Sequence, residues 1–255
     1  MILGVMLGCQ TVPVSERKAL NFIPESLEIS LGNQSYDEVL KNEKISSEPH
    51  INALVTRVGK RIAAVSGRTD YEWEFKVIDS EVMNAFCLPG GKIAVYRGIL
   101  PLAKNEAGLA TVLGHEITHA IARHGGQRIS ANIAMVGGLV VLQGTVLEKN
   151  ENAPMIMALL GLGSQVGVML PYGRMQETEA DEVGQILMAK AGYDPAESSR
   201  FWQRFGNISK GSKVPELLSD HPSDEAREAN MKDKLPRALT EYQKAPNHYG
   251  LGESF

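Results

Sequence analysis

Cysteine is scarce in this sequence of 255 residues, which contains only Cys9 and Cys87. Neither belongs to a Cys-x-x-Cys pair, so the sequence argues against a disulfide framework and against a zinc site built from cysteines. Runs of lysine or arginine are also lacking, and the formal net charge is −4. We therefore expect no nucleic-acid partner. A hydrophobic content of 43% and a charged content of 22% are typical of a globular protein.

Hydrophobic runs of membrane-spanning length are lacking as well. The two most apolar stretches, 133–147 and 154–170, both contain glycine and glutamine. The first has about 15 residues, whereas a membrane-spanning helix needs about 20. Two interpretations remain for this region: a membrane hairpin, or buried helices with a partly exposed apolar flap. The run lengths favour the second.

The first nine residues, MILGVMLGC, are apolar and end in Leu-Gly-Cys before a polar stretch. This segment resembles the end of a bacterial lipoprotein signal, in which the cysteine becomes the lipidated first residue. It is shorter than a complete signal peptide and has no basic start. A truncated lipoprotein signal with lipidation at Cys9 and a merely apolar N-terminus are the two interpretations, and we favour the first.

The sequence His-Glu-Ile-Thr-His at 115–119 is the strongest chemical signal in the chain. On a helix, His115 and His119 are separated by about 40° around the axis, so both imidazoles leave the same face. This geometry suits two ligands of one tetrahedral zinc ion, with Glu116 positioned as a general base for a water molecule. A chance match on a solvated helix face is the alternative, and the apolar surroundings argue against it.

The periodicity of apolar residues predicts the neighbouring elements. The helix that carries the motif is expected to begin at an N-cap, Asn105, and to end at Gly125–Gly126. A helical pattern covers 36–67, and alternating patterns predict three strands, at 72–78, 82–88 and 92–98. A further helix is expected to end at Ala191, before Gly192, and the next to start at Asp194-Pro195.

A catalytic zinc ion usually has three protein ligands, so a third is required. His124 would lie about 180° around a continuing helix from His115, which makes it a poor ligand. We interpret His124 as a helix C-terminal residue or a support for a ligand, with surface solvation as the alternative.

Three glutamates compete for the third position: Glu177, Glu179 and Glu182. Glu177 and Asp181 are spaced i,i+4 and share a helix face, whereas Glu179 points about 200° away from Glu177. The spacing favours Glu177 as the ligand, with Asp181 accepting the free N–H of a ligating histidine. An exposed acidic helix face is the alternative.

The combination of HEITH with Arg-x-x-Glu-x-Glu-Ala-Asp at 174–181 resembles the HtpX and CAAX-prenyl-protease-like family of zinc endopeptidases. The resemblance covers residues 40–236. It implies one zinc ion per chain, held by the residues that match the family's ligands: His115, His119 and Glu177. Membrane-embedded branches of the family have several spanning helices. The sequence pattern of this chain does not indicate such helices.

Two further segments match the family. Asn84-Ala85-Phe86 with Pro89-Gly90-Gly91 is similar to a strand that these enzymes place above the active site. The resemblance makes Asn84, Ala85, Phe86, Gly90 and Gly91 candidates for substrate binding.

The sequence Asp220-His221-Pro222, followed by Arg227, resembles the Ser/Thr-x-His-Pro segment of the soluble periplasmic branch. In that branch a histidine here can approach the metal, so His221 is a candidate fourth ligand or gate. The tetratricopeptide repeats of the β-barrel assembly-enhancing proteases are not seen.

The resemblance implies an α+β, zincin-like fold of the gluzincin type. We expect a mainly helical body and a small, mostly antiparallel sheet beside the active-site helix. Four segments are expected: a truncated signal at 1–9, a tether or surface-wrapping segment at 10–36, the metallopeptidase domain at 37–240 and a tail at 241–255.

The expected activity is hydrolysis of peptide bonds in misfolded or misassembled cell-envelope proteins, with a substrate strand lying beside an edge strand. The expected location is the bacterial periplasm, with a lipid anchor in the outer membrane and a link to outer-membrane assembly machinery. The alternative is a chaperone-like quality-control factor whose proteolysis is latent and gated by His221. A purely structural zinc is less consistent with a glutamate placed as base.

Overall fold

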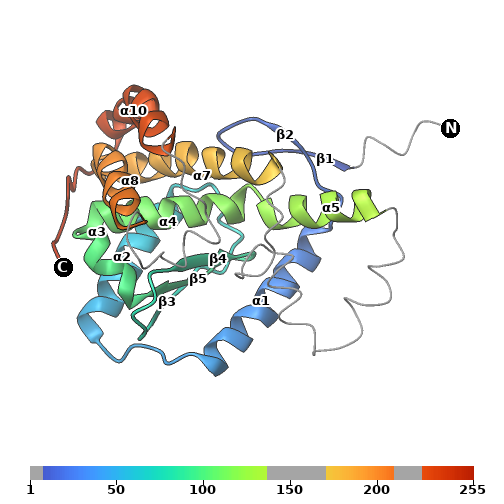
Figure 1. Ribbon diagram of the computed structural model, residues 1–255, viewed down its shortest axis with the longest axis horizontal. Coiled ribbons are helices and arrows are strands. Elements are labelled where there is room, and N and C mark those ends of the chain that lie inside the picture. Colours follow the sequence, from blue (N-terminus) through green and yellow to red (C-terminus); the bar gives the residue numbers. More distant parts are fainter. Residues whose placement is uncertain (1–7, 137–170, 210–225) are drawn as a thin grey trace.

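The computed structural model describes residues 8–136, 171–209 and 226–255, and Figure 1 shows how their helices and strands are arranged. The strands are β1 (Cys9–Thr11), β2 (Lys18–Leu20), β3 (Glu74–Ile78), β4 (Ala85–Leu88) and β5 (Lys92–Tyr96). The helices are α1 (Glu25–Asn42), α2 (Pro49–Ala64), α3 (Leu100–Ala103), α4 (Glu106–Ile121), α5 (His124–Val136), α7 (Pro171–Lys190), α8 (Ala196–Ser209) and α10 (Ala226–Lys244).

Two small sheets accompany the helices. β1 and β2 form an antiparallel hairpin, and the other sheet has the strand order β3-β5-β4. In that sheet β3 is parallel to β5, and β4 is antiparallel to it. Two of the three pairings among the described strands are therefore antiparallel. The expected α+β class, with a helical body and a small sheet beside the motif helix, is confirmed.

Helix α4 lies in the middle of the molecule, between α7 on one side and the three-stranded sheet on the other (Figure 1). Every residue of α4 is buried, the polar residues His115, Glu116 and His119 included. Its predicted N-cap is confirmed, since the Asn105 side chain accepts a hydrogen bond from the Gly108 N–H at 2.9 Å.

The predicted end of this helix at Gly125–Gly126 is wrong. α4 stops at Ile121, because Arg123 adopts a left-handed conformation with φ of 58°, and α5 begins at His124. Both glycines lie inside α5. A Cβ on Gly126 would lie 1.9 Å from Glu28 Oε1, so the glycine permits close packing of α5 against α1 and does not end a helix.

The predicted helical region 36–67 is divided between two helices. The end of α1 is followed by an extended stretch in which Ile45 pairs with Ile78 of β3, and α2 then begins at Pro49. The three predicted strands are present in shorter form, and Gly192, with φ of 91°, follows α7 as expected.

Both terminal segments contact the body. Residues 10–36, expected as a tether or surface-wrapping segment, contain the β1–β2 hairpin from Gln10 on and the first part of α1. Near the other end, the carbonyls of Leu251 and Glu253 accept hydrogen bonds from the N–H groups of Ala107 and Glu106. The C-terminal residues thus supply acceptors to the first turn of α4, whose N–H groups have no partner within the helix.

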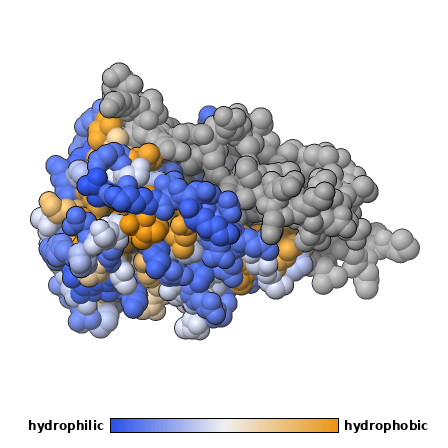
Figure 2. Space-filling model, turned by 90° about the horizontal axis from the view of Figure 1, so that it is seen from below, coloured by the Kyte–Doolittle hydropathy of each residue, from blue (hydrophilic) through white to orange (hydrophobic). Residues whose placement is uncertain are grey.

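The surface is mostly polar on the face that Figure 2 shows, where hydrophobic residues gather in small groups among hydrophilic ones. Among the described residues, no helix combines the length and the apolar character needed to cross a membrane. The two interpretations of 133–170 concern a region that lies, from residue 137 on, outside the described residues.

Candidate metal centre

Three side chains from two helices converge on one point inside the molecule. His115 and His119 come from α4, and Glu177 comes from α7. The two Nε2 atoms are 3.1 Å apart. His115 Nε2 lies 3.3 Å from Glu177 Oε2, and His119 Nε2 lies 3.4 Å from Glu177 Oε1. In a tetrahedral zinc site with bonds of about 2.0–2.1 Å, neighbouring ligand atoms are about 3.4 Å apart. The three donors therefore fit a single zinc position.

The helix periods explain how these residues meet. α4 and α7 run antiparallel, because Glu177 reaches His119 while Asp181, one turn further along α7, reaches His115. Each helix thus presents two site residues at i,i+4 spacing on the face that meets the other. All four side chains are buried. The face shared by Glu177 and Asp181 is internal, which rules out the exposed acidic face considered from the sequence.

His115 is held from behind by Asp181. Its Nδ1 lies 2.9 Å from the Asp181 carboxylate, which leaves Nε2 directed at the metal position. Arg227 of α10 donates two hydrogen bonds of 2.7 Å to the same carboxylate and lies over the Trp202 ring at 3.6 Å. Although burial opposes it, the charge of Arg227 and the bond from His115 lower the pKa of Asp181. A carboxylate is therefore maintained beside the imidazole.

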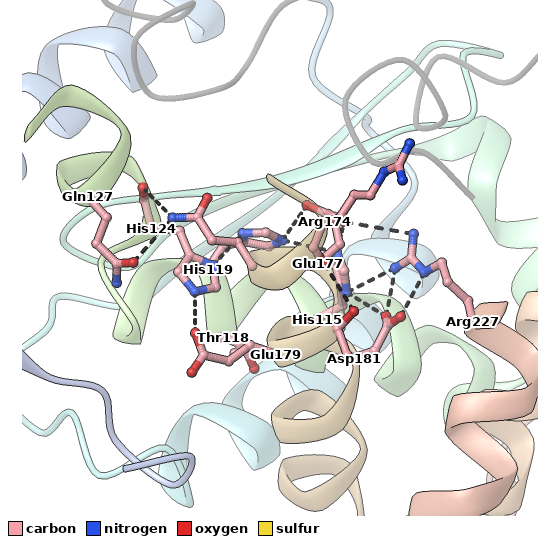
Figure 3. Close-up of polar contacts among 12 residues, drawn as sticks. His115, Thr118, His119, His124, Gln127, Arg174, Glu177, Glu179, Asp181 and Arg227 are labelled. Atoms are coloured by element: carbon pink, nitrogen blue, oxygen red, sulfur yellow. Dashed lines mark hydrogen bonds and ion pairs between the residues drawn. The ribbon is translucent and has the colours of Figure 1, made fainter. Parts of the chain in front are cut away.

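His119 is held differently, through a second histidine. Its Nδ1 lies 2.9 Å from Nδ1 of His124, whose Nε2 lies 2.9 Å from Glu179 (Figure 3). His124 is fully buried, so surface solvation does not describe it, and burial lowers its pKa to about 4. The break at Arg123 turns His124 towards His119, so the separation of about 180° from His115 that a continuous helix would give does not apply.

Sequence reasoning missed the role of Glu179. Burial opposes its ionisation, yet hydrogen bonds from His124, Arg17 and Ser15 lower its pKa to about 2. Two features of the sequence could have indicated this role. One is the second glutamate of the Glu-x-Glu pair, and the other is the histidine that lies just beyond the HExxH motif. Arg17 lies 162 positions away from Glu179 in the chain, and no local pattern connects them.

Glu116 follows His115 directly on α4. It is buried, and α4 packs against β4. Burial first, and then the charge of Glu116, raise the pKa of the Cys87 thiol in β4.

The candidate substrate residues lie in and after β4. Asn84 precedes the strand, and Ala85 and Phe86 begin it. Gly90 and Gly91, with φ of 88° and 87°, form the turn that leads to β5. A Cβ on Gly90 would meet Ile29 of α1, and one on Gly91 would meet Trp73, so both glycines have packing roles. His221 lies outside the described residues.

The fold and the site together define a metallopeptidase in which an HExxH helix and a glutamate from a second helix share one metal position. A sequence profile of peptidase family M48 matches residues 49–234. The chain belongs to peptidase family M48, whose metalloproteases depend on zinc. The expected metalloendopeptidase class is confirmed; the match establishes the family and not the HtpX or CAAX-prenyl-protease-like branch within it.

Individual relatives cover most of the chain. The mitochondrial metalloendopeptidase OMA1 of Schizosaccharomyces pombe is 37% identical over 89% of this chain and 66% of its own length. The Saccharomyces cerevisiae protein of the same name is 30% identical over 91% of this chain and 71% of its own length. The β-barrel assembly-enhancing protease of Escherichia coli is 25% identical over 89% of this chain, which spans 47% of that relative.

These relatives correct the expected location. A bacterial periplasmic protein anchored to the outer membrane was expected, and this is wrong, because the relatives at 37% and 30% identity are named as mitochondrial enzymes. The outer-membrane anchor was part of that expectation, whereas lipidation of Cys9 itself stays a prediction. In the structure Cys9 begins β1, and its side chain is exposed.

Proposed function

We propose that this chain is a zinc-dependent endopeptidase that hydrolyses peptide bonds in unfolded or misassembled proteins. The observation that carries the proposal is the convergence of His115 Nε2, His119 Nε2 and the Glu177 carboxylate on one point, with Glu116 next to His115 in the chain. A zinc ion held there would activate a water molecule and polarise the peptide carbonyl. Glu116 accepts the proton of the attacking water and returns it to the leaving amine.

The edge of β4 supplies a place for an extended substrate. The Tyr96 N–H donates to the Asn84 carbonyl, and Phe86 pairs with Ala94 two residues further on. In an antiparallel ladder the alternate residues, Ala85 and Cys87, therefore direct their backbone groups away from β5. Among the described strands β4 is at the edge, so these groups can pair with a substrate backbone.

The experiment compares the wild-type protein with Glu116→Gln. The substitution keeps the size of the side chain and removes its basicity, so we expect zinc content to be retained. Cleavage of unfolded casein should fall by about 10²–10⁴-fold, the usual contribution of a general base. A Glu116→Gln variant that cleaves casein at the wild-type rate would exclude the general-base role.

A second comparison tests the metal role itself. His119→Ala removes a ligand, so both bound zinc and cleavage should be lost. If His119→Ala cleaved casein normally, the proposed centre would not be the site of hydrolysis. The chaperone-like alternative depends on His221 and on 133–170, most of which lie outside the described residues, and no described contact favours it.

We also propose a mitochondrial location, which is supported by the names of the relatives at 30% and 37% identity. Fractionation of cells of the source organism, followed by detection with an antibody against this chain, tests the proposal. Recovery of the chain outside the mitochondrial fraction would contradict it.

A further inference from the structure

We propose that Glu179 and His124 form a positioning relay that fixes which nitrogen of His119 carries its proton, and that Arg17 holds this relay in place. The inference rests on the proposed zinc role of His119. It concerns residues that neither touch the metal position nor belong to the HExxH motif.

The relay is a continuous row of buried side chains. His119 Nδ1 lies 2.9 Å from His124 Nδ1, and His124 Nε2 lies 2.9 Å from Glu179 Oε2. The three side chains follow one another in Figure 3, leading away from the metal position. The His119 and His124 rings meet edge to face, with centroids 4.8 Å apart. None of the three residues is more than 7% exposed.

The direction of the hydrogen bonds follows from the chemistry of the two ends. A ligating imidazole offers the lone pair of Nε2 to the metal, so neutral His119 carries its proton on Nδ1 and donates it to His124. His124 Nδ1 is then an acceptor, and its proton lies on Nε2. A carboxylate can only accept, so Glu179 is the partner that Nε2–H requires. One arrangement of protons therefore gives each donor in His119 and His124 an acceptor, with Glu179 as the last acceptor.

Arg17 orients the carboxylate at the far end. Its Nε and Nη2 donate to the two oxygens of Glu179 at 3.0 Å and 2.5 Å, and Nη2 also donates to Gln127 Oε1 at 3.0 Å. Ser15 donates a further hydrogen bond to Glu179. This paired contact fixes the plane of the carboxylate, which a single point charge would not do.

The N-terminal hairpin presents Arg17 through an unusual turn. Between β1 and β2, Val14 and Glu16 have φ of 68° and 58°, a conformation that costs free energy for side chains other than glycine. Gln10 of β1 also donates to the Ala122 carbonyl, at the junction of α4 and α5. The hairpin therefore contacts both Glu179 and the junction of α4 and α5, which determines the position of His124.

The two histidine ligands are thus supported in parallel ways. Asp181, held by Arg227 from α10, bonds directly to His115. Glu179, held by Arg17 from the hairpin, acts on His119 through an intervening imidazole. Each ligand depends on an arginine from a different end of the described chain, so docking of the hairpin contributes to the geometry of the metal site.

The test measures zinc affinity for the wild-type protein, Glu179→Gln and the matched control Glu106→Gln. Glu106 is also a buried carboxylate bound by arginines, Arg57 and Arg61, and by a hydroxyl, but it lies at the start of α4. A glutamine at 179 can donate as well as accept, so it no longer specifies the proton position in His124. We expect the zinc Kd of Glu179→Gln to rise about 10–100-fold, as for other partners of metal ligands.

Nitrogen-15 NMR of the zinc-loaded wild-type protein provides a readout independent of activity. The expected result is a proton on Nδ1 of His119 and on Nε2 of His124. A proton on Nδ1 of His124 would overturn the relay, as would an unchanged Kd in Glu179→Gln. An equal loss of affinity in Glu106→Gln would also overturn it, by showing a general effect of losing a buried ion pair.

A second pair of variants applies if Glu179→Gln does not fold. Arg17→Ala should weaken zinc binding, and Arg17→Lys should restore part of it through the charge alone. Equal affinity in Arg17→Ala and the wild-type protein would overturn the role of Arg17. Failure of the wild-type protein to bind zinc would instead overturn the proposed function on which the relay rests.

Discussion

Gly114 of α4 and Gly184 of α7 approach each other closely where the helices that carry His115, His119 and Glu177 pack together. A Cβ on Gly114 would lie 2.7 Å from the Gly184 carbonyl oxygen, and one on Gly184 would lie 2.7 Å from the backbone nitrogen of His115. No side chain separates the helices at this point. Glycine at both positions therefore permits the close approach of α4 and α7 that brings Glu177 to the two histidines.

Replacing Gly184 by alanine should disturb this crossing. Because the neighbouring atoms belong to the backbone and cannot rotate away, α7 must move from α4 and take Glu177 and Asp181 with it. We expect a loss of about 1–3 kcal/mol in the free energy of unfolding, the usual cost of overpacking, together with weaker zinc binding. Urea unfolding and a zinc titration measure the two effects.

Gly173→Ala is the control for this prediction, since Gly173 lies on the same helix and a Cβ there would meet nothing within 4 Å. Alanine has the higher helix propensity, so this variant should be neutral or slightly more stable. If Gly184→Ala behaved like Gly173→Ala, close packing at the crossing would not control the site.

The helix period and the HExxH motif predict which side chains of each helix belong to the centre. Spacings of i,i+4 within α4 and within α7 place His115 with His119, and Glu177 with Asp181, without knowledge of the fold. The contact between Gly114 and Gly184 depends on which helices cross, and the Arg17–Glu179 pair depends on where the hairpin folds. Neither leaves a periodic pattern, because both join residues far apart in the chain.

The same limit applies to the fold. Apolar periodicity predicts strands and helices that the structure contains, but it did not detect the left-handed residue Arg123 that separates α4 from α5. The two glycines that follow indicate a helix end in the sequence, since glycine commonly has that role. In the structure a close approach of Glu28 to Gly126 explains the glycine.

Arg227 and Asp181 should show strong coupling in stability measurements on the metal-free protein. Both are buried, so Arg227→Met leaves the Asp181 charge with less compensation and should cost about 3–5 kcal/mol. Adding Asp181→Asn removes that charge, so the double variant should be more stable than the sum of the two single losses implies. Urea unfolding of all four proteins gives the coupling. Strict additivity would show that the ion pair does not act as a unit.

Removal of the metal should lower thermal stability. Ligand binding to the folded state stabilises it by about 2.7 kcal/mol when free zinc is 100 times its Kd. For a chain of this size this corresponds to a Tm shift of about 5–10 °C. Differential scanning calorimetry with and without a chelator measures the shift. His119→Ala, which lacks a ligand, should not respond to the chelator, and an equal response would attribute the shift to another site.

Deletion of residues 251–255 should destabilise α4 at its N-terminus. The carbonyls of Leu251 and Glu253 accept hydrogen bonds of 3.0 Å and 2.9 Å from Ala107 and Glu106, so the deletion leaves two N–H groups of a buried helix without these acceptors. At about 0.5–1.5 kcal/mol for each hydrogen bond, the free energy of unfolding should fall by about 1–3 kcal/mol.

The variant Glu253→Ala separates the backbone contribution from that of the side chain. It keeps the backbone acceptor and removes only the ion pairs of Glu253 with Arg57 and His50, which are partly exposed. Such pairs contribute about 0–1 kcal/mol, so Glu253→Ala should be clearly more stable than the deletion. Equal losses in urea unfolding would assign the effect to the charge of Glu253 and would contradict a role of the backbone acceptors at the start of α4.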